Sequence, residues 1–427
     1  MPGLSRNAMA VMAAALFFAV SATAQPSLTP VVRTSVMDSV IASVTRYYVD
    51  ADTANLIAKA LRARVSAHAY DAITNPAQLA DVVTRDLRSV NGDLHLSLSY
   101  TPPGTVSPTA PARLPDEQRM RNFGMGKAEV LDGNIGYLEI TGFVGGQYQD
   151  AVVDALRFLS RTDALIIDLR RNGGGASEMS HFIFSHFLDA KAMPTIMVRT
   201  RRSPDPQQRT SFENVPGPRR TDVPLYILTS QGTASAAEEF TFVLHNQHRA
   251  TTVGSRTAGA GHMVNGFPVG NGFTVSLSIT RVSDPVTGKE WERVGVPADI
   301  DVAPERALDA AYAAALKKVI AHAGDSPRAG QLNRLLETAE ARSRAVRVDA
   351  ATLAKFAGTY DGGRTVSVRD GQLWYTRRAG AMPDVMVPLG GNKFALGAAR
   401  FEFAEVSGKM TMTVGQPDGT ALTLNRQ

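Results

Sequence analysis

The stretch LYILTSQGTASAAEEFTFVLHNQ, residues 225–247, joins an apolar run, a loop of small residues and a helix-like pattern in direct succession. The run ends at Thr229 and Ser230, and the helical pattern begins at Ser235. A strand that passes through a short turn into a helix is the repeating unit of α/β folds. The serine has two interpretations. It is either a helix N-cap or a nucleophile beside the free N–H groups of the helix start.

The same alternation of apolar runs and helical patterns extends over residues 134–323. Strand-like runs are IGYLEIT, ALIIDLR, TIMVRT, LYILTS, TTVGS and FTVSLSIT, and helical patterns lie near residues 147–161, 176–188, 235–247 and 304–322. Alternation of this kind predicts an α/β core with a substantially parallel sheet.

Two different patterns precede this core. Residues 25–100 begin with helical spacing of apolar residues and end in DLHLSLSY, where apolar and polar residues alternate. This predicts a small helical domain that ends in a half-buried strand with His95 on its polar face. Residues 101–133 begin with a stretch rich in proline and threonine and are predicted to be a linker.

Two further segments follow the core. Residues 324–347 are polar and rich in arginine, and we expect a second linker there. Residues 348–427 contain short β-like runs separated by glycine and aspartate, which predicts a small antiparallel β domain.

Composition excludes several classes of function. The 427 residues are 44% hydrophobic and 20% charged, with a formal net charge of +5, as in ordinary globular proteins. The densest basic stretch, RTRRS at residues 199–203, is short and lacks aromatic neighbours, which argues against nucleic-acid binding. The chain has no cysteine, so disulfides, thiolate metal sites and cysteine nucleophiles are excluded.

The first 24 residues have the pattern of a secretory signal peptide. Arg6 precedes an apolar stretch, and Ala22-Thr23-Ala24 fits the small-x-small cleavage rule. We therefore expect a periplasmic or secreted protein that begins at Gln25. No other segment is long and apolar enough to span a membrane.

A second strand-to-helix turn carries three successive glycines. In IIDLRRNGGGASEMS an apolar strand ends at Asp168-Leu169-Arg170, and Gly173, Gly174 and Gly175 precede a helix. Such a turn is either a tight connection or one half of an oxyanion hole, because glycines let backbone N–H groups approach a ligand. The pattern is neither a phosphate loop nor a dinucleotide fingerprint.

Histidines and one late glutamate are candidates for proton transfer. His181, His186, His245 and His248 lie on helical patterns without a matching carboxylate cluster, so we expect packing or surface roles and no metal site. His95 and His262 remain as candidate bases, and their spacing does not choose between them. Glu292, in GKEWERVGVPADIDV, is a candidate partner for a histidine or a solvated loop carboxylate.

Five motifs in order resemble serine peptidase family S41, which includes carboxy-terminal processing peptidases, the tricorn core and proteins like the interphotoreceptor retinoid-binding protein. The motifs are GYLEI, DLRRNGGG, TSQGTASAAEEF, VGSRTAGAGH and WERVGVPADIDV, between residues 134 and 302. The segment that ends in GDLHLSLSY is similar to the N-terminal part of the branches without a PDZ domain. The resemblance implies a crotonase-like α/β core.

The resemblance also implies roles for single residues. It makes Ser235 the nucleophile, His95 the base and Glu292 the end of the relay, with His262 as the alternative base. The oxyanion hole would consist of the N–H of Ala236 and one N–H from Gly173, Gly174 or Gly175. Processing peptidases carry a lysine where this chain has Ala260, which removes the usual base of that branch. In the glutamate motif Arg293 replaces a usual glycine and Ala298 a usual proline.

The sequence therefore predicts an exported serine peptidase that acts on peptides or proteins without a metal or cofactor. Two alternatives remain open. One is a non-catalytic protein of the same fold that binds an apolar ligand or a peptide terminus, and the other is an esterase or amidase that uses the same serine. Cleavage preference and oligomeric state are not predicted.

Overall fold

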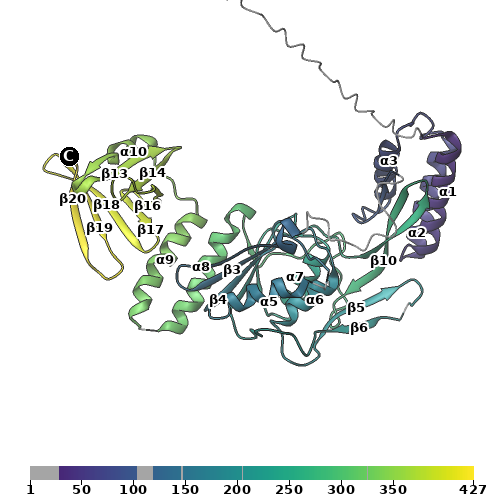
Figure 1. The fold of residues 1–427 in the computed structure, drawn as a ribbon, viewed down its shortest axis with the longest axis horizontal. Helices are drawn as coiled ribbons and strands as arrows, with labels where there is room; N and C mark the ends of the chain where they lie inside the picture. The colour runs from purple at the N-terminus through teal and green to yellow at the C-terminus, as the bar shows by residue number, and fades with distance from the viewer. Residues whose placement is uncertain (1–27, 103–118, 146–147, 204, 325) are drawn as a thin grey trace, which may run out of the picture.

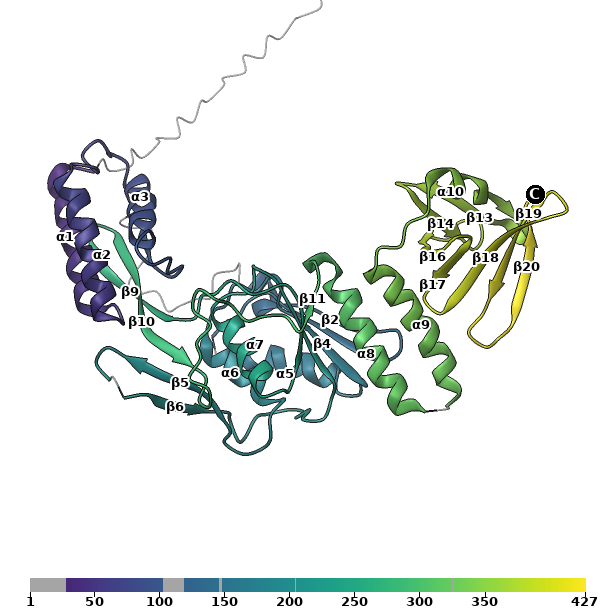
Figure 2. The same ribbon diagram turned by 180° about the vertical axis from the view of Figure 1, so that it is seen from behind.

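The computed structural model describes residues 28–102, 119–145, 148–203, 205–324 and 326–427. The signal peptide expected over residues 1–24 and part of the expected linker 101–133 lie outside these ranges. The molecule is elongated, with N-terminal helices at one end, an α/β core in the middle and a β-rich part at the other end (Figures 1 and 2). Within the described ranges no helix has the length and apolar character needed to cross a membrane.

Three helices form the N-terminal end: α1 (Pro30–Tyr47), α2 (Ala51–Ser66) and α3 (Pro76–Arg88). Each starts at a polar side chain that accepts a backbone N–H of its first turn, from Thr29, Asp50 and Asn75 respectively. Their apolar faces share one core with strands β1 (Ser97–Tyr100), β9 (Met263–Gly270) and β10 (Phe273–Ser283). The helical part is therefore completed by β1, which follows it directly, and by β9 and β10, which begin only at Met263 and Phe273.

These strands belong to one antiparallel sheet. Its order is β1-β10-β5-β6, and β9 also pairs with β10; the two further strands are β5 (Pro194–Thr200) and β6 (Gln207–Thr210). Strand β10 is long enough to pair with β1 through its first half and with β5 through its last residues. It thereby connects the N-terminal helices to the core (Figure 1).

The predicted α/β core is confirmed, but it begins earlier than predicted, because the strand Met125–Leu131 of its sheet lies within the expected linker 101–133. Its sheet has the order β11-β8-β7-β4-β3-β2, in which only β2 is antiparallel to its neighbour. The strands are β2 (Met125–Leu131), β3 (Ile135–Ile140), β4 (Ala164–Asp168), β7 (Leu225–Thr229), β8 (Thr251–Gly254) and β11 (Ile300–Asp301). Strands β4 and β7 are buried along their whole length, as expected for parallel strands covered on both faces.

Helices cover both faces of this sheet. Alternate strand residues pack against α5 (Gln149–Phe158), α6 (Ser177–Ser185) and α7 (Ala236–Asn246) on one face. The other residues pack against α8 (Ala307–Ala323) and α9 (Pro327–Ser343). Single 3-10 turns span Asn122–Gly124 (η1) and Pro304–Arg306 (η3). Parallel strands place Ser235 and the three glycines at the same carboxyl edge of the sheet.

The expected linker over residues 324–347 is wrong, because helix α9 occupies most of it. Leu332, Leu335 and Ala339 recur at helical spacing and are buried against α8 and the sheet. Arginines and glutamates on the remaining positions hid this narrow apolar stripe in the sequence.

The C-terminal part is antiparallel β structure, as predicted. After α10 (Ala350–Phe356), two sheets have the orders β12-β13-β14-β15 and β16-β17-β18-β19-β20, and a 3-10 turn at Asp361–Gly363 (η4) connects β12 to β13. Their strands are β12 (Gly358–Tyr360), β13 (Arg364–Arg369), β14 (Gln372–Thr376), β15 (Asp384–Val385), β16 (Val387–Gly390), β17 (Lys393–Leu396), β18 (Ala399–Val406), β19 (Lys409–Gly415) and β20 (Ala421–Asn425). Arg400 on β18 reaches α9, where it bonds to Glu337 at 3.0 Å and to Thr338.

Candidate active site

Ser235 occupies the strained position between β7 and α7. Its backbone angles are φ 54° and ψ −123°, a conformation that costs a non-glycine residue on the order of 1–3 kcal/mol. The Ser235 N–H donates to Glu238 Oε2 at 3.0 Å, which holds the turn in place. The neighbouring N–H of Ala236 has no acceptor in the part of the chain that the structure describes. A hydroxyl and a free helix-start N–H therefore lie side by side.

The glycine turn after β4 lies directly against this serine. Gly174 is buried with φ 107°, and a Cβ added to it would lie 2.7 Å from Ser235 Cβ and 2.9 Å from the Ala234 carbonyl oxygen. Only glycine fits there. Because the Gly174 N–H donates to Asn172 Oδ1 at 2.9 Å, it is not a free donor. The N–H groups of Gly173 and Gly175 have no acceptor among the described residues and remain candidates for the oxyanion hole.

His95 does not lie on a strand, contrary to prediction. Strand β1 begins at Ser97, and His95 lies in the turn before it. The turn is held by Asp93, whose Oδ1 accepts the His95 N–H at 2.9 Å. The imidazole is largely buried, and neither ring nitrogen has a hydrogen-bond partner in the described part of the chain. Such orphaned nitrogens in a native fold call for a functional explanation.

Burial lowers the pKa of His95, and electrostatic interactions with His262 and Arg88 lower it further, whereas Asp93 raises it. The imidazole is therefore neutral at neutral pH and able to accept a proton. Its Nδ1 lies 3.9 Å from Asp93 Oδ1.

Asp93 is the central acid of the site, and the sequence analysis missed it. It is fully buried, accepts the Tyr48 hydroxyl at 2.9 Å, and lies with Oδ2 3.4 Å from His262 Nδ1. Burial alone would raise the pKa of Asp93, but the contact with His262 and the His95 N–H lower it to about 2. The only local indication of its role was the sequence Asp-Leu-His. An aspartate often accepts the backbone N–H of the residue two positions later and so stabilises a turn.

Glu292 lies beside His262, and the structure describes no ion pair between Glu292 and His95. Glu292 Oε2 accepts the N–H groups of Gly261 and His262 at 2.7 and 3.1 Å and lies 3.8 Å from His262 Nδ1. Burial raises the pKa of Glu292, an effect that His262 opposes and Asp93 reinforces. The predicted pairing of Glu292 with His95 is thus replaced by a group in which Asp93 lies between the two histidines.

The loop that contains Ala260 is bound to the serine turn by Glu238. This buried carboxylate accepts the N–H groups of Gly259 and Ala260, both at 2.7 Å, and the Thr257 hydroxyl. Because Glu238 also accepts the Ser235 N–H, the nucleophile turn and the loop that leads to His262 are fixed relative to each other. Between Ser235 Oγ and either imidazole the described residues contain no hydrogen bond, which is common before substrate binds.

The remaining histidines have other surroundings. His181 is buried and bonds to the Thr210 carbonyl at 2.7 Å, and burial lowers its pKa to about 4. His186 is buried between the carbonyls of Phe182 and Pro216. His245, in the last turn of α7, pairs with Asp299 at 3.1 Å, at the opposite end of the helix from Ser235. These contacts fit the packing and surface roles expected from the sequence.

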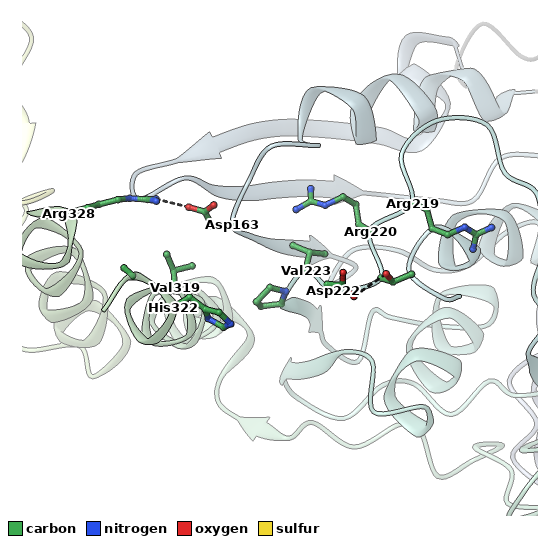
Figure 3. Close-up of a pocket in the computed structure, with 11 residues that line it drawn as sticks. Asp163, Arg219, Arg220, Asp222, Val223, Val319, His322 and Arg328 are labelled. Atoms are coloured by element: carbon green, nitrogen blue, oxygen red, sulfur yellow. Dashed lines mark hydrogen bonds and ion pairs between the residues drawn. The ribbon is translucent and has the colours of Figure 1, made fainter. Parts of the chain in front are cut away.

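A pocket of about 590 Å³ lies at the opposite edge of the parallel sheet (Figure 3). It is lined by residues that precede β4 and β7 and by the end of α8, among them Asp163, Arg220 and Val319. Arg220 donates to the carbonyls of Leu159 and Thr162, and Asp163 pairs with Arg328. Arg220 and Asp163 thus have partners within the fold, and we regard the serine site as the better candidate for the active site.

Comparison with known proteins agrees with this geometry. Residues 134–302 match the sequence model of Peptidase family S41. The core of this chain is therefore similar to S41 peptidases. The match begins before β3 and ends after β11, so it includes Ser235, the glycine turn and Glu292 but excludes His95.

Two curated proteins that are similar to this core are named as processing proteases. The carboxyl-terminal-processing protease of Synechocystis sp. is 30% identical over 154 residues, which cover 36% of this chain and 34% of that protein. The carboxy-terminal processing protease CtpA of Bacillus subtilis is 29% identical over 156 residues, with coverages of 36% and 32%. The chain thus spans about a third of the length of these relatives. The solved structure of the photosystem II D1 C-terminal processing protease aligns with 64% of this chain and 93% of its own, at 16% identity and a TM-score of 0.43.

Proposed function

We propose that this protein is an exported serine peptidase that cleaves peptide bonds through an acyl-enzyme intermediate. The observation that carries the proposal is the placement of Ser235, at a strained backbone position at the start of α7, in contact distance of the glycine turn. A strained serine beside unpaired N–H groups suits nucleophilic attack and stabilisation of the resulting oxyanion. The match to S41 peptidases supports the same reaction.

In the proposed reaction, Ser235 Oγ attacks the scissile carbonyl carbon while His95 accepts the hydroxyl proton. The N–H of Ala236, with that of Gly173 or Gly175, stabilises the negative oxygen of the tetrahedral intermediate. His95 then donates its proton to the leaving amine. Water attacks the acyl-enzyme by the same route and releases the second product.

Asp93 has the role of orienting His95, because it holds the turn of that residue and lies beside Nδ1. Glu292 contributes through His262, whose Nδ1 lies 3.8 Å from Glu292 Oε2 and 3.4 Å from Asp93 Oδ2. The rival arrangement makes His262 the base, since its Nδ1 faces two carboxylates and leaves Nε2 for the serine. We favour His95 because both of its buried nitrogens lack a partner.

Labelling with a fluorophosphonate probe tests the nucleophile. We expect one covalent adduct, which peptide mapping assigns to Ser235, and none in the Ser235→Ala variant. An unlabelled protein that nevertheless binds apolar ligands or peptide ends would instead support a non-catalytic role. A labelled protein that hydrolyses esters and leaves every peptide intact would support the esterase alternative.

Paired histidine variants test the base. His95→Ala is expected to lower kcat by several orders of magnitude, as loss of a triad member does, and His262→Ala by much less. His245→Ala serves as the matched control, because His245 also pairs with an acid but lies away from the serine. The reverse ranking of the first two variants would assign the base to His262.

We propose peptide or protein substrates, in line with the names of the relatives. Matched peptides with free and amidated carboxyl termini separate a carboxy-terminal peptidase from an endopeptidase. For export, N-terminal sequencing of the protein from cells is expected to begin at Gln25. A mature chain that still begins at Met1 in the cytoplasm would contradict the proposed location.

A further inference from the structure

The acids and histidine beside the serine site converge on one small volume. Asp93, His262 and Glu292 each offer one ligand atom, and these atoms lie within 4.8 Å of one another. The three residues come from the turn before β1, the loop before β9 and the loop after β10. Their side chains are 0%, 11% and 8% exposed.

The distances in this group are longer than those of strong direct pairing and leave room for a bound ion. His262 Nδ1 lies 3.4 Å from Asp93 Oδ2 and 3.8 Å from Glu292 Oε2. Charge-assisted hydrogen bonds are shorter, at about 2.7–2.9 Å. Ligands about 2.0–2.1 Å from a tetrahedral metal are separated by roughly 3.3 Å, close to the first of these distances.

An unpaired oxygen supports this interpretation. Glu292 Oε1 is buried and has no hydrogen-bond partner among the described residues. A buried carboxylate oxygen without a partner is costly, and a bound cation removes that cost. The carboxylates are also held by neighbours, as metal ligands are: Tyr48 donates to Asp93, and Gly261 and His262 donate backbone N–H groups to Glu292.

We propose that Asp93, His262 and Glu292 form a zinc-binding site with an open fourth position, and that zinc bound there inhibits the peptidase. One imidazole and two carboxylates suit Zn²⁺, whereas Mg²⁺ and Ca²⁺ prefer six or more oxygen ligands. The inhibitory half of the proposal rests on the proposed function. Zinc would engage both Asp93 and Glu292, the acids that support the histidines of the relay.

Binding is measured first in the metal-free Ser235→Ala protein, so that activity plays no part. Calorimetric titration with zinc chloride is expected to show one ion per chain, and magnesium chloride no binding. His262→Ala and Glu292→Gln, each added to Ser235→Ala, are expected to weaken zinc binding at least ~10-fold. His245→Ala serves as the control, because it removes the histidine of another His–acid pair and is expected to leave binding unchanged.

Inhibition is measured in the parent protein. Zinc is expected to inhibit peptide cleavage at the concentration at which it binds, and EDTA to restore activity. Absence of one-to-one binding, or equal loss of binding in His245→Ala, overturns the zinc site while leaving the peptidase proposal intact. If the parent protein binds zinc but cleaves no peptide, the zinc site is supported and the proposed peptidase function is wrong. Thermal unfolding of each variant identifies any that has lost its fold.

Discussion

The backbone N–H groups of Ser235 and Ala260 donate to the same atom, Oε2 of Glu238, at 3.0 and 2.7 Å. Processing peptidases place their catalytic lysine where this chain has Ala260. Here that position contributes no ionisable group, yet its main chain is still bound to the nucleophile turn. The loop therefore supports the serine turn and positions the residues that follow it, up to His262.

Glu238→Gln tests this support. The carboxylate accepts from four donors, and an amide would turn its NH₂ group toward some of them. We expect a loss of about 1–3 kcal/mol in the free energy of unfolding and at least a ~10-fold lower kcat/KM. Chemical denaturation and peptide cleavage assays measure the two effects. Activity equal to that of the parent would show that the loop position does not matter for catalysis.

Gly174→Ala and Gly173→Ala form a matched pair. A Cβ at residue 174 would lie 2.7 Å from Ser235 Cβ, whereas one at residue 173 meets no atom within 4 Å. We therefore expect Gly174→Ala to abolish labelling of the serine and to lower the unfolding temperature, and Gly173→Ala to keep the fold. The interpretation of the turn is wrong if the alanine at residue 174 is tolerated as well as the alanine at residue 173.

The strain at Ser235 predicts a difference between two inactive variants. Both Ser235→Ala and Ser235→Gly lack the hydroxyl, but only glycine adopts φ 54° without steric cost. Ser235→Gly is expected to be more stable than Ser235→Ala by about 1 kcal/mol, measured by chemical denaturation. Equal stabilities would indicate that the turn relaxes when the serine is replaced.

Glu239 predicts a pH dependence of stability. Burial raises its pKa from 4.5 to about 7, although the Ser177 hydroxyl and Arg209 oppose the shift. The folded protein therefore retains a proton that the unfolded chain releases above pH 4.5. Its contribution to stability is complete below that pH and is lost as the pH rises through 7.

In thermal unfolding from pH 5 to 8, we expect the parent to lose stability relative to Glu239→Gln, which has no proton to release. Glu178→Gln, at an exposed position on α6, provides the control and is expected to follow the parent. Parallel curves for the parent and Glu239→Gln would contradict the raised pKa.

The sequence was most informative where local pattern and fold agree. Buried runs of β-branched residues and leucine predicted β4 and β7, and the turns after them predicted Ser235 and the glycines at one edge of the sheet. The alternation around His95 was misleading, because Leu94 is 46% exposed and pairing with β10 begins only at Ser97. Alternation describes two faces, but it does not show where a partner strand begins.

The role of Asp93 could not be predicted from the neighbouring sequence, because its partners are distant in the chain. Its partners Tyr48 and His262 are 45 and 169 residues away in the sequence. Helix α9 was missed because its apolar stripe is narrow and its partner surface, α8 with the sheet, is absent from any local window. Both errors concern contacts between distant segments, which a single sequence does not reveal.

The pairing of β1 with β10 has a consequence for the order of synthesis. Ser99 and Thr274 are hydrogen-bonded neighbours although 175 residues separate them. While the ribosome is still adding residues before β10, the turn with His95 has no strand on which to dock, and the glutamate at 292 does not yet exist. A nascent or prematurely terminated chain that ends before β10 therefore lacks the assembled group of Asp93, His262 and Glu292.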